Sequence, residues 1–149
     1  MAGPRRMSFA RSGSLATATE TLVVDASVAV KAAMTDGFEA LGGRRLLAPT
    51  LLWSEASSAL AHLGWRGEIS TDEEQAALAR LVEAVIEPRE SRLLVIRAAA
   101  LARRHGWART YDAEYVALAE LERVPLVTLD ARLRRALAGR IDVRGPEEL

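Results

Sequence analysis

The stretch from Thr110 to Asp130, TYDAEYVALAELERVPLVTLD, places the strongest constraint on what this chain can fold into. Its first part is a mostly apolar helix pattern that Asp112 opens, and its second part, residues 126–129, is a short β-prone run. A helix, a turn and a buried strand in succession favour a parallel α/β sheet. Ligands bind beyond the carboxyl ends of the strands in such sheets, and Asp130 stands at one of these ends.

The rest of the chain repeats this alternation of strand and helix patterns. The predicted strands are residues 21–24, 45–48, 126–129 and 141–143, and the predicted helices are residues 28–34, 50–63, 71–85, 92–105, 112–121 and 131–137. Ser70 and Glu73 fit a capping box at the start of the third helix, and Pro88 is expected to end that element. The apolar residues of this helix that are expected to face inward are Ala76, Leu78, Leu81, Val82 and Val85.

Length and composition limit the classes of protein to consider. The 149 residues predict one domain over 21–149, preceded by a flexible N-terminal extension over 1–20. With no Cys and two His, the chain offers no thiolate metal site or Cys nucleophile, and a multi-histidine zinc site is disfavoured. The absence of Cys fits a reducing compartment, and we expect a cytoplasmic protein. No apolar run approaches the roughly 20 residues of a membrane span.

Four acids occupy corresponding positions in this pattern. Asp25 follows the first predicted strand and Asp130 follows a later one, while Glu55 and Asp112 lie near the starts of helices. Each acid has a simpler explanation when taken alone. Asp25 is a favoured helix N-cap, and Glu55 could be an ordinary solvated side chain. If the sheet is parallel, however, all four can converge at one end of it.

Clustered carboxylates predict a metal site. They raise one another's pKa unless a cation neutralises them, and no Lys or Arg is adjacent in sequence to Asp25, Glu55 or Asp130. Ligand sets made only of oxygen select hard ions such as Mg²⁺ or Mn²⁺. Metal-dependent hydrolysis of a phosphodiester follows as a hypothesis. Ser27 and Thr128 are candidates to orient a water or a ligand, with local turn hydrogen bonds as the alternative.

Local positive charge lies just before Asp112, although the formal net charge is zero. Residues 92–109 contain five Arg and no acid. Among them, Arg103, Arg104 and Arg109 are candidates for contacts to the phosphates of a substrate beside the acidic site. A solvated helix face explains the same stretch equally well. Competing chemistries lack their motifs, since the chain has no G-x-x-x-x-G-K-[ST], G-x-G-x-x-G or G-x-S-x-G.

Five segments in order resemble the PIN-domain ribonucleases, and most of all the VapC toxins of bacterial toxin–antitoxin pairs. They are VVDASVAVK, APTLLWSEASSAL, GWRGEIS, YDAEYVALAE and PLVTLDARL. The resemblance covers about residues 21–143. It departs from many relatives at Ala32, where Trp is frequent, and at Ser58, where Asn is common.

This resemblance implies a three-layer α/β/α sandwich with a central parallel sheet and an Mg²⁺- or Mn²⁺-dependent endoribonuclease. Asp25, Glu55, Asp112 and Asp130 match the acidic quartet of the family, and Ser27 matches its small hydroxyl residue. The implied partners are a structured RNA such as tRNA or rRNA, a VapB-like antitoxin and a second copy of the chain.

A non-catalytic PIN-like scaffold that only binds another protein is the alternative hypothesis. Geometry separates the two hypotheses. In an enzyme the four carboxyl groups should converge on one cleft within reach of a shared metal, and a Glu55 that points to solvent on the far side of its helix would exclude this function.

Overall fold

Strands and helices alternate along the chain in the computed structural model, which describes residues 18–35 and 37–149. The strands are β1 (Thr21–Val24), β2 (Arg45–Pro49), β3 (Ile86–Arg89), β4 (Leu126–Val127) and β5 (Val143–Arg144). The helices are α1 (Ala26–Met34), α2 (Leu51–Trp65), α3 (Thr71–Glu83), α4 (Arg92–His105), α5 (Tyr111–Glu122) and α6 (Ala131–Leu137), followed by the 3₁₀ turn η1 (Pro146–Glu148).

The five strands form one parallel sheet in the order β3-β2-β1-β4-β5. After Thr21 the central strand β1 is apolar, and Leu22, Val23 and Val24 are completely buried. Strands that are covered on both faces read as continuous apolar runs, which explains this composition. The predicted α/β fold with a central parallel sheet is therefore confirmed.

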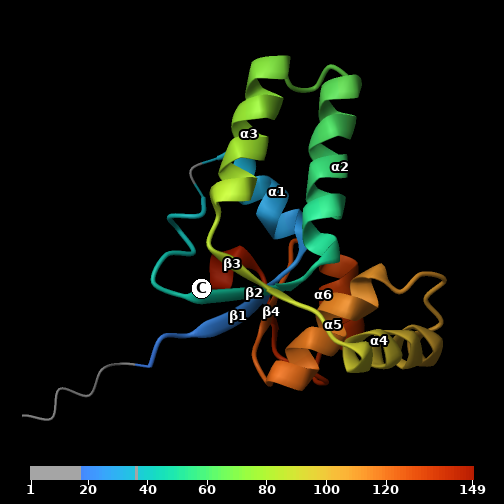
Figure 1. Ribbon diagram of the computed structural model, residues 1–149. Helices are drawn as coiled ribbons and strands as arrows, with labels where there is room; N and C mark the ends of the chain where they lie inside the picture. The colour runs from blue at the N-terminus through green and yellow to red at the C-terminus, as the bar shows by residue number, and fades with distance from the viewer. Residues whose placement is uncertain (1–17, 36) are drawn as a thin grey trace, which may run out of the picture.

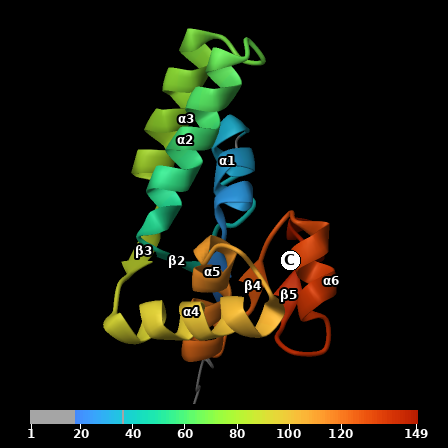
Figure 2. The ribbon, with the colours of Figure 1, turned by 90° about the vertical axis from the view of Figure 1, so that its right-hand side faces the viewer.

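Helices cover both faces of the sheet, which gives the three layers (Figures 1 and 2). On one side α1 packs against α2 and α3, and these two helices stand side by side and project away from the sheet. On the other side α5 packs on β1, β2 and β4, and α4 packs against α5. Within the part of the chain that is described, no helix has the length and apolar character needed to cross a membrane.

The expected N-terminal extension, residues 1–20, falls mostly outside the described residues, which begin at Ala18. Glu20 lies at its end and makes two ion pairs, with Arg44 at 2.9 Å and Arg144 at 2.8 Å. These pairs join the start of β1 to the loop before β2 and to the edge strand β5. The folded domain thus includes Glu20.

One strand differs from the prediction. The sequence pattern predicts a helix that Pro88 ends, but residues 86–89 form β3, which pairs in parallel with β2. Pro lacks the N–H that a central strand needs for its ladder, so sequence patterns count it against a strand. An edge position tolerates Pro88 because β3 has only one neighbour. The last strand is also shifted, from 141–143 to Val143–Arg144.

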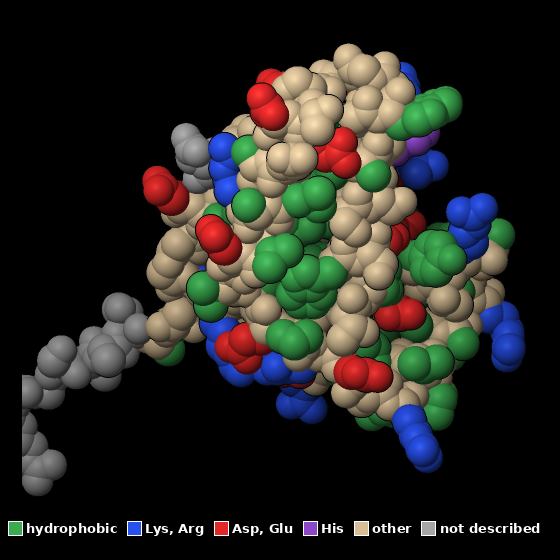
Figure 3. Space-filling model, turned by 45° about the horizontal axis from the view of Figure 1, so that its top comes forward, with side chains coloured by type: hydrophobic (Ala, Val, Ile, Leu, Met, Phe, Trp, Pro, Cys, Tyr) green, Lys and Arg blue, Asp and Glu red, His purple; other side chains and the backbone are tan. Residues whose placement is uncertain are grey.

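The buried side of α3 also differs from the prediction. The capping box of Ser70 and Glu73 is present, and Leu81 is buried as expected. Ala77 is buried in place of Ala76, whereas Val82 is 74% exposed and Val85, which lies beyond the end of α3, is 88% exposed. The reason is that α3 is an outer helix that packs on α1 and α2 through a narrow stripe. Hydrophobic side chains therefore remain among charged ones on the molecular surface (Figure 3).

Two adjacent residues of α3 test which face of this helix is buried. Leu81→Ala should lower the free energy of unfolding by about 2–5 kcal/mol, because it leaves a cavity where a fully buried side chain packs. Val82→Ala, the matched control, should change it by less than about 0.5 kcal/mol. Urea denaturation followed by circular dichroism measures both. Equal losses of unfolding free energy in the two variants would contradict the burial of Leu81 and the exposure of Val82.

Candidate active site

The carboxyl ends of β1 and β4 bring two parts of the candidate site together. The two strands pair in parallel, with Val24 opposite Val127. The backbone N–H of Asp25 donates to the carbonyl of Val127 at 3.2 Å, so the ladder continues one residue past the end of β1. Asp25 and Thr128 are consequently neighbours, although the chain separates them by 103 positions.

Both oxygens of the Asp25 carboxylate accept hydrogen bonds. Oδ1 accepts from the hydroxyl of Ser27 at 2.6 Å and from the backbone N–H of Val28 at 3.1 Å, and Oδ2 accepts from the hydroxyl of Thr128. The two hydroxyls in turn accept backbone N–H groups, Ser27 from Leu129 and Thr128 from Asp130, each at 3.0 Å. Asp25 is thus the N-cap of α1 and also the centre of a network that joins α1 to the end of β4.

Burial raises the pKa of Asp25, which is only 7% exposed. The hydrogen bonds from Ser27, Thr128 and Val28 oppose this rise, and the negative charge of Asp112 adds to it. A carboxylate that is buried this deeply needs such donors to remain ionised.

Glu55 points from α2 toward α5. Its Oε2 accepts a hydrogen bond of 2.5 Å from the hydroxyl of Tyr115, a residue buried in the core. Partial burial raises the pKa of Glu55, the Tyr115 hydrogen bond opposes the rise, and the charges of Asp112, Asp25 and Glu114 add to it. Burial and the Glu55 carboxylate raise the pKa of Tyr115 far above its usual value, so its hydroxyl remains a neutral donor.

Asp112 is the electrostatic centre of the group. It is exposed in the first turn of α5, where its negative charge interacts favourably with the positive end of the helix dipole. Its charge raises the pKa of Asp25 and of Glu55. Partial burial raises the pKa of Asp112 itself, with a further rise from Asp130 and an opposing effect from Arg132. Asp112 therefore lies within electrostatic range of each of the other three acids.

Asp130 is turned toward its own helix. As the N-cap of α6 it accepts the backbone N–H groups of Arg132 and Leu133 at 2.8 and 3.3 Å. The guanidinium of Arg132 lies 3.3 Å from its Oδ2. Burial acts to raise the pKa of Asp130, but these hydrogen bonds outweigh it and the pKa is lowered. Of the four acids, Asp130 is the one whose ionised form is already stabilised by its own surroundings, with no need of a bound metal ion.

The donors at this edge suit a hard cation by their chemistry. They are carboxylate and hydroxyl oxygens, and three of the four acids have raised pKa values that a bound cation would lower. In residues 18–35 and 37–149, however, no three Asp, Glu or His side chains stand close enough together to hold a metal ion. Joint coordination therefore requires side-chain rotation, and the exposed Asp112 is the acid with most freedom to rotate.

Two hollows border three of the four acids, Glu55, Asp112 and Asp130. A groove of about 1050 Å³ contains Ser27 and Glu55, together with Lys31, His62 and Arg109. A smaller hollow of about 210 Å³ contains Asp112, Asp130 and Arg132. Of the three Arg that the sequence suggested for phosphate contacts, Arg109 lines the groove. Arg103 and Arg104 instead lie exposed in the last turn of α4, where they complement the helix dipole.

Sequence reasoning missed three contributors to this site. Tyr115 holds Glu55, Lys31 lines the groove, and Arg132 pairs with Asp130. Helical spacing could have identified two of them. Tyr115 follows Asp112 by three positions and Lys31 follows Ser27 by four, so each pair shares one helix face.

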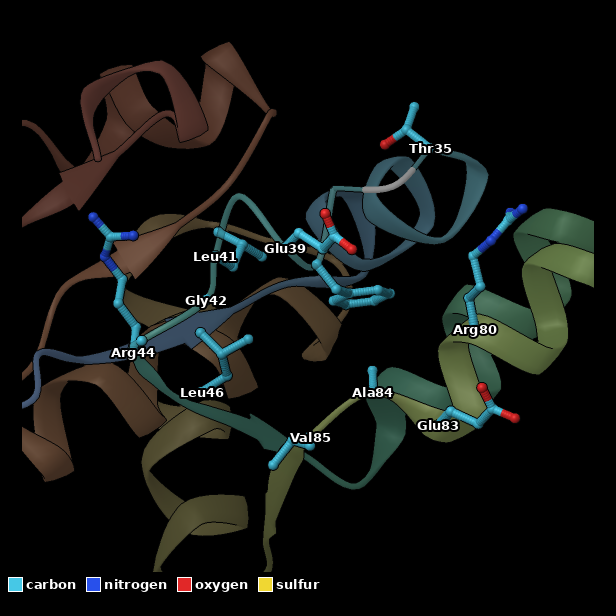
Figure 4. A pocket seen from close by; sticks show the side chains of 12 residues that line it. Thr35, Glu39, Leu41, Gly42, Arg44, Leu46, Arg80, Glu83, Ala84 and Val85 are labelled. Atoms are coloured by element: carbon cyan, nitrogen blue, oxygen red, sulfur yellow. The ribbon is translucent and has the colours of Figure 1, made fainter.

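A further hollow, of about 520 Å³, lies between residues 37–44 and the end of α3, and contains none of the four acids (Figure 4). Its two arginines already have partners, since Arg44 pairs with Glu20 and Arg80 donates to the carbonyl of Ala33 at 2.8 Å. Leu41 and Leu46 contribute apolar walls. This hollow offers no arrangement for phosphodiester chemistry.

Known proteins share this fold. The structure of PAE2754 from Pyrobaculum aerophilum has 25% identity and a TM-score of 0.70, covering 87% of this chain and 92% of its own. A toxin–antitoxin complex from Klebsiella pneumoniae has 18% identity and a TM-score of 0.59, covering 84% and 97%. VapBC2 from Rickettsia felis, bound to a promoter DNA fragment, has 13% identity and a TM-score of 0.58, covering 84% and 98%.

The comparison with curated proteins found no match. Residues 22–137, which include all four acids and most of the chain, match the PIN domain family. The chain therefore belongs to the PIN domain family.

Proposed function

We propose that the protein is a metal-dependent endoribonuclease and the toxin of a toxin–antitoxin pair. One observation carries the nuclease proposal: in a chain of the PIN family, Asp112 couples electrostatically to Asp25, Glu55 and Asp130 at the carboxyl edge of the sheet. Acids whose pKa values are raised by burial and by one another's charge are a frequent sign of a functional site.

Asp25, Glu55 and Asp112 are the residues proposed to hold Mg²⁺ or Mn²⁺, and Asp130 is proposed to act through a water. When bound, such an ion would polarise a phosphoryl oxygen and lower the pKa of a water, which is the chemistry that phosphodiester hydrolysis needs. The hydroxyls of Ser27 and Thr128 fix the orientation of the Asp25 carboxylate, since each donates to a different one of its oxygens. This leaves little rotational freedom at the most buried ligand.

RNA is the proposed substrate because cations line the groove beside the acids. Lys31 and Arg109 are both exposed there, close to Ser27 and Glu55. Positive side chains in this position can contact the phosphates that flank a scissile bond. We propose a structured RNA, of the tRNA or rRNA class, and additional phosphate contacts from Arg103 and Arg104.

The toxin role is supported by relatives of the same fold, of which one is a toxin–antitoxin complex and another is VapBC2 bound to promoter DNA. We propose a VapB-like antitoxin as partner and a homodimer as the assembly. Exposed apolar residues on α4 support burial against another chain: Leu93, Val95 and Ile96 are 51%, 63% and 65% exposed. Light scattering of the purified protein tests the dimer.

A non-catalytic protein-binding scaffold remains the second candidate function. The absence of a preformed three-acid cluster among the described residues favours it. The orientation of Glu55 speaks against it, because this carboxylate faces α5 and lines the groove instead of lying on the far side of α2.

Removal of the acids tests the nuclease. Asp25→Asn and Asp112→Asn should each reduce Mn²⁺-dependent cleavage of cellular RNA by at least about a hundredfold, since loss of an outer-shell partner alone costs about 10- to 100-fold. EDTA should abolish cleavage by the wild type. Gel analysis of RNA measures the rates, and circular dichroism checks the fold. A wild-type protein that is freed of antitoxin and inert with Mn²⁺ would favour the scaffold.

Arg109→Gln tests the groove. It should weaken RNA binding to the Asp25→Asn protein for all sequences alike and reduce the slope of log K against log salt by about 1, as expected for a lost phosphate contact. Arg123→Gln is the control, because it removes the same charge at the opposite end of α5 from Asp112. Fluorescence anisotropy measures binding, and equal effects of the two variants would argue against a specific contact.

Expression in bacteria tests the toxin role. Induced wild-type protein should arrest growth and generate new RNA ends, whereas Asp25→Asn should do neither, because growth arrest depends on cleavage. Growth curves and sequencing of RNA ends provide the readouts. Arrest by both proteins to the same degree would assign the toxicity to binding alone.

A further inference from the structure

Glu55 differs from Asp25 and Asp130 in which part of the chain supplies the hydrogen bond to its carboxylate. Asp25 is held by Thr128, the residue after β4, and by groups of its own helix, and Asp130 is held by its own helix. Glu55 lies on α2 and receives its hydrogen bond from α5, 60 positions further along the chain. Among residues 18–35 and 37–149, the Tyr115 hydroxyl is the only hydrogen-bond donor to the carboxylate of Glu55.

Tyr115 is well placed to give this support. It is 2% exposed, and its ring belongs to the core beneath the acids. It lies three positions after Asp112, so the same helix face carries Asp112 and the group that holds Glu55. The core fixes the ring, and the ring fixes the position of its hydroxyl.

From this geometry we propose that Tyr115 is a positioning residue for the metal site. Its hydroxyl donates a hydrogen bond to Oε2 of Glu55 and holds this long side chain toward Asp112 and Asp25. The other carboxylate oxygen, Oε1, is left for the cation. A glutamate without such a contact would have to lose rotational freedom at the moment of binding. The inference rests on the proposed function, since it assigns Tyr115 a part in building that same site.

Tyr115→Phe tests the proposal because it keeps the ring and removes only the hydroxyl. Its affinity for Mn²⁺ should fall about tenfold, the lower end of the effect of a lost outer-shell partner. Electron paramagnetic resonance of free Mn²⁺ measures the affinity without RNA. Tyr111→Phe is the control, because it removes the hydroxyl of a 52% exposed tyrosine one turn earlier on α5 and should bind Mn²⁺ as the wild type does.

A double-mutant cycle separates positioning from a general effect on the fold. If Tyr115 acts through Glu55, Tyr115→Phe should have no further effect on Mn²⁺ affinity in a Glu55→Ala background. A similar loss in both backgrounds, or unchanged affinity in Tyr115→Phe alone, would overturn the proposal. So would a Tyr115→Phe protein that fails to fold in EDTA, since the hydroxyl would then serve the fold.

The outcomes also separate this inference from the proposed function. Wild-type protein that binds Mn²⁺ but cleaves no RNA would count against the nuclease alone, and the affinities would still decide the role of Tyr115. Wild-type protein that binds no Mn²⁺ would overturn the proposed metal site and the role of Tyr115 with it.

Discussion

The parallel pairing of β1 with β4 is the constraint on which the site depends. It places the residues after the two strands side by side, so Asp25 meets Thr128 across a long separation in sequence. A buried carboxylate without partners would be strongly destabilising. Here the two hydroxyls and the N-terminus of α1 supply the donors, and the hydroxyls are themselves held by backbone N–H groups of residues 129 and 130. The chain can thus keep an acid at 7% exposure in an apolar core.

The acids at this edge of the sheet lower the stability of the folded protein near neutral pH. Asp25, Glu55 and Asp112 have raised pKa values, so the folded protein binds protons at these sites more readily than the unfolded chain does. Their contribution to stability therefore falls as the pH rises through those pKa values. Such a loss is characteristic of functional sites, where groups are arranged for chemistry at the expense of stability. Asp130 behaves in the opposite way, because its lowered pKa reflects an ordinary N-cap with an ion pair.

The two sides of the molecule consequently differ in what their charged residues do. Around the start of β1, Glu20 is shared between Arg44 and Arg144, and these pairs join segments of the fold. At the carboxyl edge, acids lie near one another while the cations Lys31 and Arg109 line the adjacent groove. Paired charges at one end and clustered like charges at the other are consistent with structure at the first and function at the second.

The sequence by itself determined the fold class, the four candidate acids and the two hydroxyl residues beside Asp25. It could do so because apolar runs, caps and strand ends are local patterns, and because the carboxyl ends of parallel strands share one edge. Only the tertiary structure decided that Pro88 lies in an edge strand and that Val82 and Val85 face outward, since both depend on which neighbours an element acquires. The contact of Tyr115 with Glu55 was likewise decided by packing, because nothing local relates residues 60 positions apart.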